Sequence, residues 1–236
     1  MPKPTSIISL DPIDRKKKLG IIGKLMITRW FGGKKVTKTD AYGHYMFCGP
    51  QRQGKTASVL WYAEMLRNKY MKPNWVRRKI LKKKPMDVKV WSNFGAGKKI
   101  TKEEIFDLID QFDPYANEVR IILIDEIHTY FPKDGVDKET RQIINDLNAV
   151  FSQLGKRNTY VLSTAQVYGR LDKALREQCL FMVDCSVSPG RTLVNAFIPQ
   201  DDIIADDLGR WSGRPKRIYR HGLSKMKYDT KKIIRE

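Results

Sequence analysis

The sequence predicts an α/β fold in which a mostly parallel sheet is covered by helices on both faces. Three observations support this prediction. Apolar, strand-like runs alternate with helical patterns along most of the chain. A glycine-rich turn separates the first of these strands from the helix that follows it, and a later apolar run ends in two carboxylates, as is typical of a buried parallel strand. The length of 236 residues is enough for one such domain with short extensions.

The regular alternation of elements begins near residue 44. Thr101 and Glu104 form the capping-box signature of a helix start, and Gly155 is a typical helix stop. We expect strands over 44–49, 87–95, 120–126, 158–166 and 179–187, a further strand at an edge of the sheet over 192–199, and helices over 56–70, 100–112, 138–155 and 171–179.

Composition divides the chain into three expected regions. Residues 1–40 mix proline, glycine and lysine around an apolar patch at 19–26, and we expect a basic arm or an extra element there. Residues 41–206 are the expected α/β core, with a basic insertion around 71–85. Residues 207–236 are expected to form a basic C-terminal tail.

Charge indicates the kind of partner. The chain has 45 Lys and Arg against 26 Asp and Glu, a formal net charge of +19. Such an excess favours a polyanion, either nucleic acid or an anionic membrane surface. The excess is uneven, because 67–102 holds thirteen basic residues and one acidic residue, whereas 103–206 is acidic overall.

The basic insertion has two interpretations. It can be a solvated surface that only improves solubility, or a segment that contacts phosphates. The second is favoured because both ends of the chain carry charge of the same sign. It assigns DNA binding to Arg77, Arg78, Lys79, Lys82, Lys83 and Lys84.

Several classes of protein are excluded by simple counts. The longest run without a charged residue, 158–169, has 12 residues, against the ~20 needed to cross a bilayer, so no transmembrane segment is expected. The N-terminus lacks the apolar core of a secretory signal. Cys48, Cys179 and Cys185 are odd in number and widely spaced, which indicates a reducing environment without a disulfide framework or zinc site.

The strongest motif follows the first strand. It matches the P-loop pattern G-x-x-x-x-G-K-[ST], and its residues are Gly49, Pro50, Gln51, Arg52, Gln53, Gly54, Lys55 and Thr56. In this pattern backbone N–H groups and a helix N-terminus surround phosphate oxygens. Lys55 is expected to reach the β- and γ-phosphates and Thr56 to ligate Mg²⁺, so the sequence predicts a site for ATP and Mg²⁺.

A second motif places two carboxylates at the end of a buried strand. In a parallel sheet the ligand crevice lies at that end. Asp125 is expected to hold Mg²⁺ through water, and Glu126 to polarise the water that attacks the γ-phosphate. A base beside the metal ligand favours hydrolysis over transfer to a small molecule. His128 is expected to be a packing or rim residue rather than a catalyst.

Together, GPQRQGKT, VWSNFG, ILIDEIH, the Lys-Arg pair before STAQ, and LDKALR resemble the FtsK–HerA superfamily of DNA-pumping ATPases over about 42–187. Within it the chain is most similar to small viral genome-packaging ATPases, with zonula occludens toxin-like phage assembly ATPases as close relatives. The resemblance implies a RecA/FtsK-like P-loop NTPase fold. Zonula occludens toxin-like proteins usually carry a membrane-spanning segment downstream, and FtsK and HerA proteins carry added domains. We expect neither feature in this chain, and both departures favour the packaging ATPases.

The resemblance also implies roles for matching positions. The Walker A and Walker B roles fall on Lys55, Thr56, Asp125 and Glu126. Gln166 matches the glutamine at the end of the strand next to the Walker B strand. Arg157 matches a basic position that acts on a neighbouring subunit's nucleotide, and Arg176 is a second candidate for that role. For Arg157 a second interpretation stays open, in which it only caps the preceding helix.

These features predict an ATP-driven translocase that packages double-stranded DNA into a preformed viral capsid. The resemblance implies a homo-oligomeric ring, expected to be a hexamer, with capsid or portal-vertex proteins as further partners. It places the protein in the host cytoplasm or at the packaging vertex of the virion. The alternatives are an ATPase for filamentous phage assembly or extrusion, and a nucleotide-dependent DNA-binding protein without motor activity. A small-molecule kinase is least expected, because it would leave the +19 charge unexplained.

Overall fold

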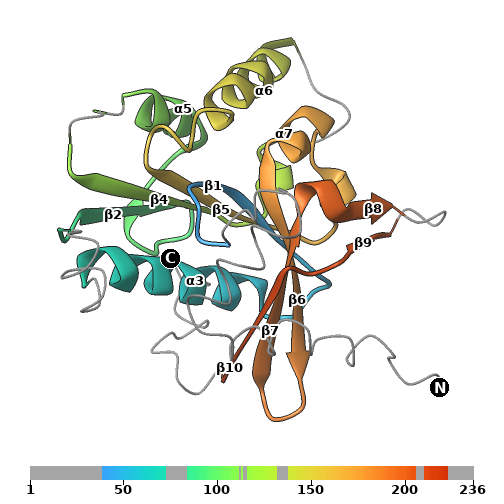
Figure 1. The fold of residues 1–236 in the computed structure, drawn as a ribbon. Coiled ribbons are helices and arrows are strands. Elements are labelled where there is room, and N and C mark those ends of the chain that lie inside the picture. Colours follow the sequence, from blue (N-terminus) through green and yellow to red (C-terminus); the bar gives the residue numbers. More distant parts are fainter. Residues whose placement is uncertain are drawn as a thin grey trace, which may run out of the picture. The chain divides into compact units, whose positions relative to one another are not determined.

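The computed structural model describes residues 39–72, 84–111, 113, 116–131, 138–205 and 210–222 (Figure 1). These residues all belong to one structural unit of the chain, Thr39–Glu236. The expected N-terminal arm lies outside the described residues except for its last two positions. Most of the basic insertion lies outside them as well.

The fold is organised around an eight-stranded sheet with the strand order β10-β7-β6-β1-β5-β4-β2-β3 (Figure 1). The six strands from β6 to β3 in this order are parallel to one another, and β7 is antiparallel to both β6 and β10. The bounds are β1 Gly43–Cys48, β2 Asp87–Ser92, β3 Lys98–Lys99, β4 Glu118–Ile124, β5 Thr159–Ala165, β6 Cys179–Ser188, β7 Thr192–Pro199 and β10 Arg217–Gly222. A separate two-stranded sheet contains β8 Ile203–Ala205 and β9 Trp211–Gly213.

Helices cover both faces of the sheet, which confirms the predicted fold class. Helix α3 lies on one face, and α5, α6 and α7 lie on the other (Figure 1). Their bounds are α3 Lys55–Met71, α5 Lys102–Asp110, α6 Lys138–Phe151 and α7 Lys173–Glu177. The capping box predicted for α5 is present, because Thr101 Oγ1 accepts from the Glu104 amide and the Glu104 carboxylate accepts from the Thr101 amide.

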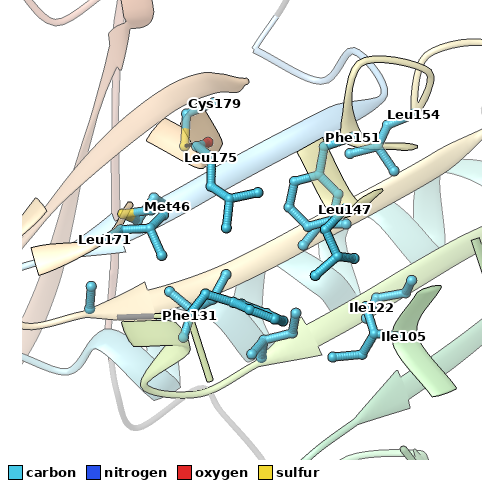
Figure 2. Packing of buried hydrophobic residues seen from close by; sticks show 14 of the residues in the cluster. Met46, Ile105, Ile122, Phe131, Leu147, Phe151, Leu154, Leu171, Leu175 and Cys179 are labelled. Carbon is cyan, nitrogen blue, oxygen red and sulfur yellow. Dashed lines mark hydrogen bonds between the residues drawn. The ribbon is translucent and has the colours of Figure 1, made fainter. Parts of the chain in front are cut away.

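The core has one apolar layer on each face. Successive side chains of a strand point to opposite faces, so Tyr45 and Phe47 of β1 pack against Tyr62 of α3, whereas Met46 packs on the other face. Figure 2 shows this second layer, in which Leu147 from α6 lies above strand residues. Every residue of β1 is buried, which explains why its sequence reads as a continuous apolar run.

The expectation that the strand over 192–199 lies at an edge of the sheet is wrong. Strand β7 was expected at an edge, but β10 pairs with it on the outside, from Arg217 opposite Phe197 to Gly222 opposite Thr192. The expected tail over 207–236 therefore contains a strand of the main sheet. Its basic residues conceal the strand pattern in the sequence, while Tyr219 packs edge-on against Phe197 at a centroid distance of 5.2 Å.

No helix within the described ranges is long and apolar enough to cross a membrane.

Strand order brings the candidate site residues together. Strand β1 lies between β6 and β5, and β5 lies between β1 and β4. In the register, Cys48 is opposite Ala165, Ile124 is opposite Ser163, and Ser92 is opposite Leu123. The residues that follow β1, β2, β4 and β5 therefore meet at one edge of the sheet.

Candidate nucleotide site

The glycine-rich loop between β1 and α3 is closely packed against the β6–β7 hairpin. Gly49 has φ 149°, and a Cβ there would lie 2.7 Å from the Cys185 carbonyl oxygen. Gly54 has φ 71°, and a Cβ there would clash with the Leu193 side chain. Both glycines are thus required by backbone conformation and by close approach. The motif forms the tight turn that the sequence predicts.

The loop ends at the N-terminus of α3. Gly54 is the N-cap residue and has no side chain to bond the first amides of the helix. Lys55, which is 8% exposed, donates from Nζ to the Pro50 carbonyl oxygen at 3.1 Å across the loop. The ammonium group is therefore held inside the turn, beside a helix N-terminus, where an anion is electrostatically favoured.

The other side chains of the loop face different surroundings. Pro50, Gln51 and Arg52 are exposed, and Arg52 has φ 63°. Gln53 Oε1 accepts from the Val187 amide of β6 at 2.9 Å, so this side chain ties the loop to the hairpin. Pro50 has no N–H group, so the backbone amides of Gln51, Arg52 and Gln53 are the ones that can face a phosphate here, whereas the Gln53 side chain already has a protein partner.

Two thiols flank the loop. Cys48 and Cys185 are buried and free, and burial raises the pKa of each thiol well above its ordinary value. They therefore remain protonated and serve as packing groups rather than nucleophiles. Cys179 is also free and buried.

Thr56 and Asp125 come together from separate elements. Thr56 Oγ1 in the first turn of α3 lies 3.3 Å from Asp125 Oδ1 and 3.5 Å from Oδ2. A hydroxyl and a carboxylate are hard oxygen donors of the kind that Mg²⁺ binds alongside phosphate oxygens and water. Within the described residues, no group of three or more His, Cys, Asp or Glu side chains could hold a metal by itself. As hard oxygen donors, Thr56 and Asp125 suit a cation whose other ligands are phosphate oxygens and water.

Glu126 follows Asp125 in the left-handed conformation, with φ 50°. Its amide donates to Thr164 Oγ1 at 2.8 Å. Its Oε2 lies 3.3 Å from His128 Nδ1, and both atoms are buried without a hydrogen bond in the described part of the chain. His128 thus lies beside the candidate base, closer than its expected role as a packing or rim residue suggests.

Sequence reasoning did not identify two residues that bind the Asp125–Glu126 segment. The Asn93 side-chain carboxamide donates to the Asp125 carbonyl oxygen and accepts from the Asp125 N–H group. The Thr164 hydroxyl donates to Asp125 Oδ1 at 2.6 Å. Both lie in expected strands, over 87–95 and 158–166, but no role was expected for either side chain. A polar residue at each strand end bordering the Asp-Glu strand was the available signal.

Gln166 directly follows β5, one residue beyond Ala165, which is paired with Cys48. It is half-buried, and its side chain has no hydrogen bond among the described residues. Its backbone position lies between the glycine-rich loop and the Asp125–Glu126 segment, as the strand order requires.

The two candidate arginines differ in their surroundings. Arg157 precedes β5, at the opposite end of the strand from Gln166, and bonds the end of α5. Arg176 in α7 donates from Nε to the Leu171 carbonyl oxygen at 3.1 Å, and its guanidinium carbon lies 4.8 Å from the Trp211 ring centroid. Both guanidinium groups are thus held by partners outside the glycine-rich loop.

Of the six expected DNA-binding residues, only Lys84 is described, and it is exposed in the segment before β2. Arg77, Arg78, Lys79, Lys82 and Lys83 lie outside the described residues.

A parallel sheet with a glycine-rich loop, a Lys-Thr helix start and a strand-end Asp-Glu pair at one edge defines a P-loop NTPase fold. The family "ATPase family associated with various cellular activities (AAA)" matches residues 45–187, and the chain belongs to this family. No curated protein sequence matches the chain at a significant level.

Solved structures with similar folds include the N-terminal domain of zonular occludens toxin from Neisseria meningitidis, at 16% identity and a TM-score of 0.47, covering 76% of this chain and 94% of that one. An E. coli MS115-1 HORMA:CdnC:Trip13 complex has 14% identity and a TM-score of 0.47, covering 77% and 64%. The pCW3 conjugation coupling protein TcpA with ATPgS has 15% identity and a TM-score of 0.43, covering 61% and 49%.

Proposed function

We propose that the chain hydrolyses ATP at this site and uses the energy to move double-stranded DNA. The observation that carries the first half is the convergence of Lys55, the Thr56–Asp125 pair and Glu126 at one edge of the sheet. The second half rests on the net charge of +19, since a nucleotide hydrolase has no need of such a charge for its own chemistry.

Each side chain has a distinct role in this proposal. Lys55 and the free amides at the start of α3 bind the β- and γ-phosphates. Glu126, whose side chain is 34% exposed, accepts a proton from the attacking water through its carboxylate, and His128 Nδ1 lies 3.3 Å from the buried Oε2 of that group. Gln166, at the end of the intervening strand, contacts the γ-phosphate and distinguishes ATP from ADP.

Thr56 and Asp125 are the residues that would hold Mg²⁺. Their oxygens lie 3.3 to 3.5 Å apart and fit a hard cation shared with phosphate oxygens. When bound, Mg²⁺ neutralises the charge that develops on the phosphates during hydrolysis. The Thr56–Asp125 contact connects the first turn of α3 to the end of β4, so the two ligands are already close together.

We further propose that the DNA is a viral genome and that the motor loads it into a preformed capsid. The support is the resemblance of GPQRQGKT, ILIDEIH and STAQ with LDKALR to packaging ATPases, together with the basic segments. In this proposal the active form is a homo-oligomeric ring, a hexamer, that encloses DNA and docks on capsid or portal-vertex proteins in the host cytoplasm and in the virion. The basic insertion contacts the DNA backbone.

Two measurements test the proposal in sequence. The first is ATP turnover with no DNA, with a short duplex and with kilobase-length duplex at equal nucleotide concentration. A translocase hydrolyses faster as the duplex lengthens, whereas a DNA-binding protein without motor activity shows no dependence on length. The second is displacement of a third strand from a triplex placed along the duplex. Turnover without displacement would overturn the translocase assignment and leave an ATPase of another kind.

Packaging needs its own test, because a filament-extrusion ATPase would share the same core. Purified empty capsids of the virus that encodes the chain, mixed with the chain, ATP and DNA, are expected to protect DNA from nuclease. Protection that requires ATP and fails with Lys55→Ala supports packaging. Translocation along duplex without protection in the presence of those capsids would contradict it.

A further inference from the structure

We infer that Asn93 and Thr164 are positioning residues that hold the Asp125–Glu126 segment from both sides. Asp125 and Glu126 follow β4, while Asn93 follows β2 and Thr164 belongs to β5. Strands β2 and β5 are the two neighbours of β4 in the sheet. Each neighbour therefore supplies one side chain to the segment that carries the candidate metal ligand and base. The inference rests on the proposed function of that segment.

Asn93 extends the hydrogen-bond ladder between β2 and β4 beyond the last strand residues. Its own amide donates to the Leu123 carbonyl oxygen at 3.3 Å. Its side-chain Nδ2 then donates to the Asp125 carbonyl oxygen at 3.1 Å, and its Oδ1 accepts from the Asp125 amide at 2.8 Å. The carboxamide thus takes the place of a backbone peptide and fixes the backbone of Asp125 on both sides.

Thr164 makes the corresponding contacts from the other side. Its hydroxyl donates to Asp125 Oδ1 at 2.6 Å and accepts from the Glu126 amide at 2.8 Å. A hydroxyl has one donor and two acceptor sites, so both bonds can form together. The residue is 1% exposed, which keeps water from replacing either bond. The hydrogen bond from the Glu126 N–H group to Thr164 stabilises the left-handed backbone conformation of Glu126, which has φ 50°.

The arrangement distinguishes the two carboxylate oxygens of Asp125. Oδ1 accepts the short bond from Thr164 and lies 3.3 Å from Thr56 Oγ1, whereas among the described residues Oδ2 has only the longer 3.5 Å contact from Thr56. Oδ2 is therefore the oxygen that is free to face a metal ion or its bound water. Partners that orient a metal-binding carboxylate in this way contribute to metal affinity although they never touch the metal.

The test compares Thr164→Val with Thr164→Ser. Valine keeps the branched shape but removes the hydroxyl, whereas serine keeps the hydroxyl and removes a methyl group. The readout is the affinity for a fluorescent ATP analogue, titrated with and without Mg²⁺, so hydrolysis is not needed. We expect Thr164→Val to need about 10- to 100-fold more Mg²⁺ for half-maximal enhancement of binding. Thr164→Ser is expected to stay within about threefold of the unmodified chain.

If Thr164 only maintained the general structure of the site, Thr164→Val would also weaken binding of the analogue without Mg²⁺. Binding of the analogue without Mg²⁺ depends on Lys55 and the loop, so it is expected to be the same in all variants that fold. If Thr164→Val and Thr164→Ser need the same Mg²⁺ concentration, the inference is wrong while the proposed ATPase function stands. If the unmodified chain binds no ATP analogue at all, the proposed function fails and the inference fails with it.

A second pair of variants decides the matter if Thr164→Val does not fold. Asn93→Asp replaces the donor to the Asp125 carbonyl with an oxygen and is expected to raise the Mg²⁺ requirement about tenfold or more. Its matched control is Asn117→Asp. Asn117 donates to the Pro85 carbonyl oxygen at 2.9 Å and joins the same two strands at their other end, before β4 begins. Equal Mg²⁺ requirements in the two variants would overturn the inference.

Discussion

Arg157 forms a two-pronged contact with Asp110, in which Nη1 and Nη2 each lie 3.1 Å from Oδ1. Nη1 also donates to the Ile109 carbonyl oxygen at 2.6 Å, and Nη2 donates to Gln153 Oε1 at 3.0 Å. The guanidinium thus caps α5 rather than the helix that directly precedes it. These contacts favour the interpretation in which Arg157 is a structural cap, although its action on a neighbouring subunit stays a prediction to be tested.

Arg157→Ala is expected to lower the free energy of unfolding by about 1 to 2 kcal/mol, because the hydrogen bond to the partly buried Ile109 carbonyl is removed. Urea unfolding at neutral pH measures this change. Asp110→Asn is the matched control. It removes only the charge of a carboxylate whose side chain is 54% exposed, and it is expected to cost less than about 1 kcal/mol. Full stability in Arg157→Ala would contradict the capping role.

Mixing subunits tests which arginine acts between subunits. Lys55→Ala cannot bind the phosphates, and an arginine variant cannot serve its neighbour. If Arg176 acts in trans, mixed rings of Arg176→Ala and Lys55→Ala regain part of the ATPase activity that each lacks alone, since some interfaces then pair an intact site with an intact arginine. We expect this recovery with Arg176→Ala, whereas Arg157→Ala is expected to keep ATPase activity on its own and to gain none from mixing. Recovery with Arg157→Ala alone would reverse this assignment.

Lys55→Ala and Glu126→Gln are both expected to abolish ATP hydrolysis, for different reasons. Lys55→Ala removes a charge-assisted hydrogen bond to the phosphates and with it the affinity for ATP. Glu126→Gln removes only the carboxylate that activates water, so it still binds ATP. Equilibrium binding of a fluorescent analogue and steady-state phosphate release separate the two effects. Normal turnover by Glu126→Gln would show that another group is the base.

Replacing Lys82, Lys83 and Lys84 with Ala is expected to weaken the binding of every duplex sequence alike. For each phosphate that the protein no longer neutralises, the slope of log K against log salt becomes less negative by about 0.9. Fluorescence anisotropy over a series of salt concentrations measures the slope. Lys156→Ala combined with Lys173→Ala is a control on two exposed lysines elsewhere. An unchanged slope in the triple variant would show that these lysines of the basic insertion do not contact DNA phosphates and only form a solvated surface.

His44 predicts how stability depends on pH. It is fully buried, 2.7 Å from Ser163 Oγ and 3.1 Å from Cys179 Sγ, and burial lowers the pKa of its imidazole to about 3. The unfolded chain binds a proton on this histidine near pH 6.5. Between these values the unfolded state holds more protons, so the free energy of unfolding falls as the pH decreases below about 6.5.

His44→Gln removes this contribution and is compared with the unmodified chain by urea unfolding at pH 7.5, 6 and 5. The stability difference between the two proteins is expected to shrink by up to about 1.4 kcal/mol per pH unit below pH 6.5. His221→Gln is a second case, expected to give a smaller change of the same sign, because burial lowers the pKa of that half-buried histidine to about 4 while solvent screens part of the effect. A stability difference that does not change with pH in His44→Gln would exclude a neutral, buried His44 as the cause.

Local signals were sufficient for most elements of the fold. The Thr101–Glu104 capping box and the buried runs of β1, β4 and β5 each have a physical cause within a few residues, so their positions agree with expectation. Strand β10 was missed because Arg217 and Arg220 dominate a strand whose inward packing depends on Phe197, a residue distant in the sequence.

The fold class and the residues of the candidate site could be predicted from the sequence alone. The spacing of its residues defines the glycine-rich loop. The Asp125–Glu126 pair is confined to the end of a buried strand, because burying two carboxylates inside the sheet would be too costly. What surrounds these groups depends on the tertiary structure. Asn93 and Thr164 reach Asp125 because β2 and β5 flank β4, and Arg157 binds the end of α5 rather than that of α6. Such contacts depend on strand order and register, which join residues 32 to 48 positions apart and leave no periodic pattern in the sequence.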